Sequence, residues 1–185
     1  MSNRALILDR DGVINHDFGY VHRPDQCEFI DGIFELTKAF TEHGYFILIA
    51  TNQSGIGRGF YDQAQFQIFM SWVADAFRAR GVRISRTYHC PDHPTEAFGK
   101  YRRHNPWRKP GAGMFLQAAK DFNLDLPSCW AIGDKDSDIV AARTAGIGTL
   151  VHFVSGVTAV ERVKDVWLVP TLQSVLPLLE QHHSN

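Results

Sequence analysis

The stretch 5-ALILDRDGVIN-15 decides the fold of this chain. Its apolar residues 5–8 lead directly into Asp9, Arg10 and Asp11. A short, uninterrupted apolar run is typical of a strand buried on both faces, as in parallel α/β sheets. Ligands of such sheets bind beyond the carboxyl ends of the strands, so we expect both acidic residues at a binding site.

Similar apolar runs recur along the chain and alternate with helical patterns. They predict five further strands, at residues 45–50, 86–90, 129–132, 149–154 and 166–169. Four helices are predicted by apolar residues at helical spacing, which are Ile33, Leu36 and Phe40; Phe66, Phe69, Val73 and Phe77; Met114, Ala118 and Phe122; and Ile139, Ala142 and Ala145. This alternation predicts an α/β fold, a doubly wound and mainly parallel sheet with helices on both faces, in a single domain over residues 1–185.

The composition narrows the class of protein. A chain of 185 residues with 44% hydrophobic and 21% charged residues is typical of one globular domain. A net charge of -1 gives no general attraction to nucleic acid or to an acidic membrane surface. Three widely spaced cysteines argue against a disulfide-stapled secreted domain, and no apolar stretch approaches a membrane span. We expect a soluble, cytoplasmic monomer acting on a small molecule.

Acidic residues follow the first predicted strand. Asp9 and Asp11 lie two apart, so in extended chain their side chains face the same side. Two carboxylates that close repel unless a cation or a shared proton lies between them, and Mg²⁺ prefers oxygen ligands. The plainer alternative is a solvated turn, because Asp and Gly are common in turns.

Three other chain segments expected at the same edge carry polar residues. Thr51, Asn52, Gln53 and Ser54 follow the second strand and could bind an anion with the glycines after them, although such residues also form flexible turns. The pair 108–109 (Arg-Lys) precedes a predicted helix, whose N-terminus favours anions; the alternative is a solvated basic pair.

The fourth predicted strand leads into acidic residues again. Asp134 is the best placed of them to reach a shared site, whereas Asp136 and, in the plainer interpretation, Asp138 stabilise the N-terminus of the next helix. Acid, hydroxyl, base and acid thus follow one another at one sheet edge, which favours a single site over unrelated surface residues. Two long loops, about 10–31 and 91–110, are expected to border this site.

Four motifs together resemble a known family: DRDGVIN at 9–15, TNQSGIGRG at 51–59, RKP at 108–110 and GDKDSD at 133–138. Their order is similar to that of the haloacid dehalogenase (HAD) superfamily of phosphatases. The chain resembles most its branch of heptose bisphosphate and histidinol-phosphate phosphatases, and the loop DFGYVHRP at 17–24 is similar to the heptose enzymes. The resemblance covers nearly the whole chain and implies a Rossmann-like HAD fold without a large cap domain.

The resemblance implies roles for the site residues. Asp9 is expected to be the nucleophile that forms an aspartyl-phosphate, and Asp11 the acid/base. Thr51 and Lys109 are expected to stabilise the phosphoryl group. Mg²⁺ is expected to be held by the Asp9 and Asp134 carboxylates and by the backbone carbonyl of Asp11. The residues expected to bind substrate are Asp17, Gly19, Tyr20, Thr51, Asn52, Gln53, Ser54, Arg108, Lys109 and Lys135.

The resemblance also implies a substrate, the C7 phosphate of a heptose 1,7-bisphosphate on the way to nucleotide-activated heptose for lipopolysaccharide or capsule. Histidinol phosphate or another small sugar phosphate is the alternative within the same class. A phosphorelay receiver is the alternative in a different class, since it also combines an acidic Mg²⁺ site with a Thr and a Lys. Its acidic pair and its phosphorylated Asp come from different strands, so the DxD of one strand argues against it.

One departure from the family concerns zinc. Relatives often carry a zinc loop with a second Cys pair just before RKP, but Asn105 and Trp107 stand at those positions here. Structural zinc normally takes four nitrogen or sulfur ligands. We therefore expect no zinc and a loop held by packing around Tyr101 and Trp107; the alternative ligand set is His89, Cys90, His93 and His104.

Overall fold

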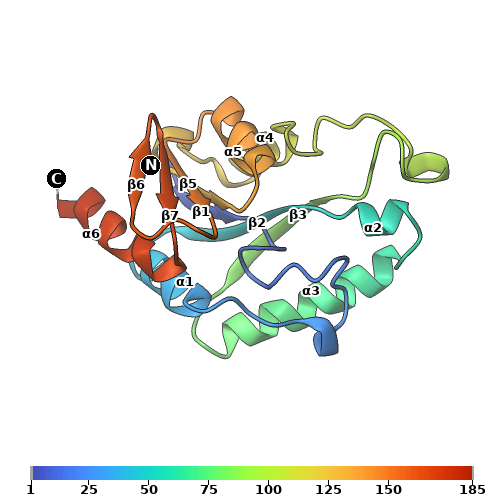
Figure 1. Ribbon diagram of the computed structural model, residues 1–185, viewed down its shortest axis with the longest axis horizontal. Helices are drawn as coiled ribbons and strands as arrows, with labels where there is room; N and C mark the ends of the chain where they lie inside the picture. The colour runs from blue at the N-terminus through green and yellow to red at the C-terminus, as the bar shows by residue number, and fades with distance from the viewer. Residues whose placement is uncertain (1, 185) are drawn as a thin grey trace.

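The computed structural model of the chain describes residues 2–184, in which seven strands form one sheet (Figure 1). The strands are β1 Ala5–Leu8, β2 Phe46–Asn52, β3 Ile84–Cys90, β4 Trp130–Gly133, β5 Thr149–Phe153, β6 Glu161–Val163 and β7 Val166–Val169. Their order across the sheet is β3-β2-β1-β4-β5-β7-β6. All neighbouring pairs are parallel except β6 with β7, so the prediction of a mainly parallel sheet is confirmed.

The predicted strands all appear, with ends shifted by up to two residues. β6 is an additional strand that the sequence pattern does not predict. It has three exposed residues at the edge of the sheet and pairs with β7 alone, so it lacks the apolar run on which the prediction depends.

The helices lie on both faces of the sheet (Figure 1). They are α1 Ile33–Glu42, α2 Ser54–Gly57, α3 Gln63–Arg78, α4 Gly113–Phe122, α5 Asp136–Ala145 and α6 Leu176–Ser184. Buried residues of α1, α3 and α6 belong to one core cluster, and those of α4 and α5 belong to another. The four predicted helices are confirmed, whereas the short α2 and the C-terminal α6 are additional. No helix within residues 2–184 is long and apolar enough to cross a membrane.

β1 separates the two core layers. Its side chains alternate, with Leu6 and Leu8 in one cluster and Ala5 and Ile7 in the other, and all four are at most 1% exposed. Complete burial of a Leu or Ile side chain contributes about 1.5–3 kcal/mol, so this strand is strongly held in register. The uninterrupted apolar run therefore has the cause that was predicted, a strand covered on both faces.

The topology places the site. β1 lies between β2 and β4, and all three run parallel, so their carboxyl ends meet at one edge of the sheet. The acidic residues lie in the segments after β1 and β4, and the hydroxyl residue Thr51 lies at the end of β2. Chain order reverses around β1, and such a switch point is where open α/β sheets bind ligands.

Candidate active site

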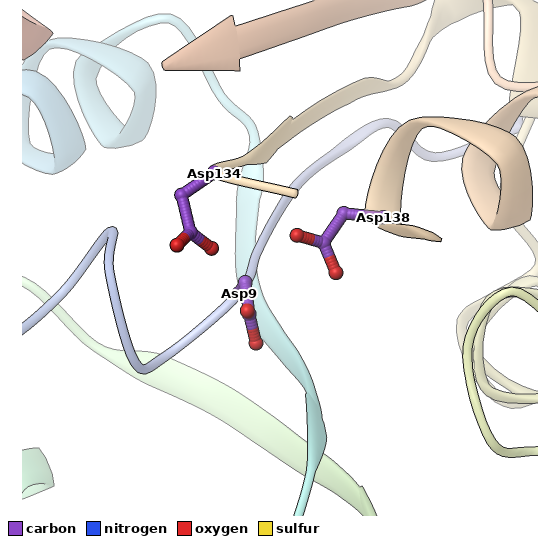
Figure 2. A group of neighbouring side chains, drawn as sticks. All are labelled: Asp9, Asp134 and Asp138. Carbon is purple, nitrogen blue, oxygen red and sulfur yellow. The ribbon is translucent and has the colours of Figure 1, made fainter. Parts of the chain in front are cut away.

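An open cavity of about 510 Å³ lies at this edge. Its lining residues are Asp9, Asp11, Asp17, Gly19, Tyr20, Thr51, Asn52, Gln53, Ser54, Gly55, Tyr61, Arg108, Lys109, Lys135, Ser137 and Asp138. The structure thus brings together every residue predicted for catalysis or substrate binding. Asp134 does not line the cavity, but its carboxylate lies beside that of Asp9 (Figure 2). A cavity of this size suits a small-molecule ligand.

Three carboxylates converge at the base of the site. Asp9 follows β1, Asp134 follows β4 and Asp138 lies in the first turn of α5, and oxygen atoms of all three lie within 4.8 Å of one another (Figure 2). Gly12 permits this approach, because a Cβ at that position would overlap the Asp134 carboxylate and its φ is +92°. Close packing of like charges at this point requires compensating positive charge.

Asp134 is only partly compensated, because the Lys135 ammonium lies 3.9 Å from its Oδ2 atom. Its Oδ1 atom is buried and has no hydrogen-bond partner within the described residues. Burial, followed by the charge of Asp9, raises the pKa of the Asp134 carboxyl to about 7. A set of oxygen donors with one unpaired buried oxygen fits a hard divalent cation such as Mg²⁺.

Lys109 supplies a fixed positive charge next to Asp9. Its Nζ atom lies 2.9 Å from Oδ1 of Asp9 and 2.6 Å from Oδ1 of Asp138, and it donates to the carbonyl of Ala50 at 2.7 Å. The residue is only 3% exposed. Burial lowers the pKa of Lys109, but Asp9 and Asp138 outweigh it and raise the pKa overall. The ammonium therefore stays charged where a phosphoryl group would meet Asp9.

Asp138 has a larger part in the site than its predicted role at a helix N-terminus. Its Oδ2 accepts from the backbone N of Lys135 at 3.0 Å, as that role requires. Its Oδ1 pairs with Lys109, however, so the residue also anchors a site cation. The repeat of Asp at 134 and 138 was the sequence signal for this, because α5 begins between them and turns Asp138 back over the strand end.

The Asp11 carboxylate is bound by protein side chains and does not share a cation site with the Asp9 carboxylate as the sequence spacing predicts. Its carboxylate accepts from Arg10 at 2.7 Å, from Asn15 at 3.0 Å and from Gln53 at 3.0 Å. Arg10 is 0% exposed and fully within the protein, so its charge balances Asp11 directly. The acidic pair that needs a cation is therefore Asp9 with Asp134, and sequence spacing alone missed the contribution of Arg10.

A series of hydrogen bonds through Gln53 fixes the position of the Asp11 carboxylate. The Tyr61 hydroxyl donates to Oε1 of Gln53 at 2.6 Å, while Nε2 of Gln53 donates to Asp11 and to Oγ1 of Thr51 at 2.8 Å. Burial raises the pKa of Tyr61 to about 12, so its hydroxyl keeps the proton that it donates. Tyr61 lies beyond the TNQSG stretch in sequence, and no motif pointed to it.

Asn52 fixes the segment that carries Lys109. Its side-chain amide donates to the carbonyl of Lys109 at 3.0 Å and accepts from the Lys109 backbone N at 3.0 Å. Both polar groups of that amide are thereby occupied by protein. Asn52 lines the cavity as predicted, but its side chain connects β2 to the loop before α4.

The outer rim of the cavity is more exposed. Lys135 pairs with Asp17 at 3.0 Å, and side chains of both are over a third exposed. Tyr20 packs on Phe60 with ring centroids 4.5 Å apart. Arg108 is half-buried, and one of its terminal nitrogens donates to the carbonyl of Asp92 at 3.2 Å.

The alternative zinc ligands do not converge. Among residues 2–184, Asp9, Asp134 and Asp138 form the only group of three or more His, Cys, Asp or Glu side chains close enough to share an ion. His89 instead contacts Gln63 at 2.8 Å. Tyr101 packs against one core cluster and Trp107 against the other, which agrees with a loop held by packing.

The chain is similar to several known proteins. Residues 106–176 match the family described as HAD-hydrolase-like. The chain is 48% identical over 149 residues to D-glycero-alpha-D-manno-heptose-1,7-bisphosphate 7-phosphatase of Burkholderia mallei, with 80% of this chain and 79% of that protein covered. It is 39% identical over 180 residues to D-glycero-beta-D-manno-heptose-1,7-bisphosphate 7-phosphatase of Haemophilus ducreyi, with 96% and 98% covered.

A solved structure agrees with the sequence relatives. D,D-heptose 1,7-bisphosphate phosphatase from B. bronchiseptica, complexed with magnesium and phosphate, superposes with a TM-score of 0.78 at 26% identity. The match covers 97% of this chain and 99% of that one. The chain therefore belongs to the HAD superfamily and, within it, to the D-glycero-D-manno-heptose-1,7-bisphosphate 7-phosphatase family.

Proposed function

We propose that this protein is a Mg²⁺-dependent phosphatase that removes the C7 phosphate of D-glycero-D-manno-heptose 1,7-bisphosphate. The observation that carries the proposal is the Asp9 carboxylate at the base of the cavity, 2.9 Å from the Lys109 ammonium and beside Asp134. The relatives that share this family are named for that substrate. Family membership argues against the phosphorelay receiver.

Asp9 is the proposed nucleophile. Its carboxylate attacks phosphorus and forms an aspartyl-phosphate, while the phosphate oxygens meet Lys109 and the hydroxyl of Thr51. Asp9, Asp134 and the backbone carbonyl of Asp11 would hold Mg²⁺, which would supply further positive charge to those oxygens. Asp138 keeps Lys109 in place through the 2.6 Å ion pair.

Asp11 is the proposed acid/base. It gives a proton to the leaving sugar oxygen and then takes one from the water that hydrolyses the aspartyl-phosphate. The bonds from Gln53 and Asn15 fix the direction of its carboxylate at the cavity wall. Positioning of this kind is a large part of phosphoryl-transfer catalysis.

The rim of the cavity supports a substrate with a second anionic group. Arg108 and Lys135 line the cavity beyond Lys109 and can meet the C1 phosphate or sugar hydroxyls. Tyr20 and Asp17 complete that wall and can contact the sugar. A monophosphate with a smaller organic group would leave these residues without a contact to the substrate.

The proposal extends to cofactors and setting. We propose that the protein carries no structural zinc, acts as a monomer and works in the cytoplasm, where the product feeds synthesis of nucleotide-activated heptose for lipopolysaccharide or capsule. Metal analysis of the purified protein checks the first point, with less than about 0.1 zinc per chain expected for a loop without four nitrogen or sulfur ligands. One zinc per chain that survives dialysis would contradict it.

The decisive experiment measures phosphate release in Mg²⁺ from the α and β anomers of heptose 1,7-bisphosphate. Histidinol phosphate and fructose 1,6-bisphosphate serve as controls. We expect kcat/KM for one heptose anomer to exceed both controls by about a hundredfold, or nearly 3 kcal/mol of transition-state binding. A preference for histidinol phosphate would replace the proposed substrate by the alternative of the same class.

A further inference from the structure

Asp92 is a buried charge that the proposed mechanism does not use. It lies two residues after β3 and is 0% exposed. Its Oδ2 accepts from Nε of Arg103 at 2.8 Å and from Nδ2 of Asn105 at 2.6 Å. Burying a carboxylate is costly unless it is paired and hydrogen-bonded, so these contacts strongly favour one conformation of the loop.

The same three residues, here called the Asp92 clasp, connect to Arg108. The carbonyl of Asp92 accepts from the Arg108 guanidinium at 3.2 Å, and the carbonyl of Asn105 accepts from the Arg108 backbone N at 2.9 Å. The side chain of Asn105 also accepts from the backbone N of Trp107 at 2.9 Å, which shapes the turn before Arg108. Both ends of Arg108 are thus bonded to members of the clasp.

We propose that the Asp92 clasp, comprising Asp92, Arg103 and Asn105, positions Arg108 against the cavity and thereby sets affinity for the second phosphate of the substrate. The inference rests on the proposed function. A guanidinium held in one orientation loses less rotamer freedom when it binds a phosphate, so the bond forms at a smaller entropic cost. Lys109 is anchored separately by Asn52, Asp9 and Asp138, so we expect loss of the clasp to disturb Arg108 more than Lys109.

The test compares two substrates that differ by one phosphate, heptose 1,7-bisphosphate and heptose 7-phosphate. Asn105→Ala removes one bond to Asp92 and one to Trp107, and we expect its KM for the bisphosphate to rise about tenfold. We expect kcat on both substrates, and KM for heptose 7-phosphate, to stay within about twofold of wild type. Arg102→Ala, at an exposed neighbouring position, is the matched control and should leave kcat and KM for both substrates unchanged.

A double variant separates positioning from general damage. Arg108→Ala should raise KM for the bisphosphate at least as much as Asn105→Ala, and the double variant should be no worse than Arg108→Ala alone. Arg103→Lys keeps a charged donor near Asp92, so it should raise KM for the bisphosphate less than Arg103→Ala does. The inference would be overturned if the effects of Asn105→Ala and Arg108→Ala on KM were additive. It would also be overturned if each variant impaired both substrates equally.

Failure of the proposed function gives a different result. In that case the wild-type protein hydrolyses neither heptose phosphate well but turns over another sugar phosphate. The same Asn105 and Arg108 cycle is then measured on that substrate, where non-additive KM effects support the clasp and additive effects overturn it. Thermal unfolding of each variant shows that the compared proteins are folded.

Discussion

The base and the rim of the cavity differ in how they hold their charges. At the base, Lys109 is 3% exposed and its ammonium contacts three oxygens of Asp9, Asp138 and Ala50. At the rim, Lys135 is about half-exposed; its ammonium lies 3.0 Å from Asp17 and 3.9 Å from Asp134. Buried, multiply bonded charges suit a reaction common to all phosphate monoesters, whereas exposed charges on loops can adapt to one organic group. The difference predicts that changes at the base lower kcat and changes at the rim raise KM.

The largest effect is expected at the nucleophile. Asp9→Asn removes the attacking carboxylate while preserving shape, so kcat should fall by at least about 10⁴-fold. Rapid-quench and steady-state phosphate release measure the loss, and circular dichroism tests the fold. Hydrolysis at a near-native rate would remove Asp9 from the mechanism.

The second-largest loss of kcat is expected for substitution of Lys109 at the base of the cavity. Lys109→Met leaves Asp9 and Asp138 without their shared cation, and kcat should fall by about 10²–10³-fold, as for loss of one transition-state donor. Asp138→Asn is the paired variant, expected to lower kcat less because Lys109 keeps its bond to Asp9. A rise in KM with unchanged kcat in either variant would place Lys109 with the rim.

The rim is expected to respond more weakly. Lys135→Ala removes an exposed cation, and KM for the bisphosphate should rise about three- to tenfold with kcat nearly unchanged. The effect should shrink at high salt, because exposed charges are screened. Steady-state kinetics at two salt concentrations measure it, and a large loss of kcat would contradict the division between base and rim.

The smallest effect concerns the stability of the metal-free protein. The pKa of Asp134 rises on folding from 3.8 to about 7, so between these values the folded state binds more protons than the unfolded state. Its contribution to stability is therefore lost as pH rises through that window. Asp134→Asn should raise Tm at pH 8 without Mg²⁺ by about 4 °C, and should change Tm much less at pH 4.

Mg²⁺ provides the control for that measurement. Added Mg²⁺ should raise the Tm of the wild-type protein more at pH 8 than at pH 5.5, because protons compete for Asp134 at the lower pH. The Asp134→Asn variant should respond little at either pH. A variant less stable than wild type at pH 8 without metal would show that Asp134 is stabilised by other contacts.

The layout of the fold and the membership of the site follow from the order of apolar and polar residues along the chain. Apolar runs such as 5–8 and 166–169 mark strands because burial on both faces excludes polar side chains. Chain alternation then places Asp9, Thr51 and Asp134 at one sheet edge, since parallel strands end on the same side. The exposed strand β6 was not predicted, because an edge strand does not require an apolar sequence pattern.

The pairing of the charges, in contrast, depends on contacts between residues far apart in the chain. Arg10 is buried against Asp11, Asp138 turns toward Lys109, and Asp92 is enclosed by Arg103 and Asn105. In the sequence, these charged and polar residues cannot be distinguished from neighbouring residues that lie on a solvated surface. Pairing depends on which loops meet over the strand ends and exclude water, because removal of water is what makes an unpaired charge costly.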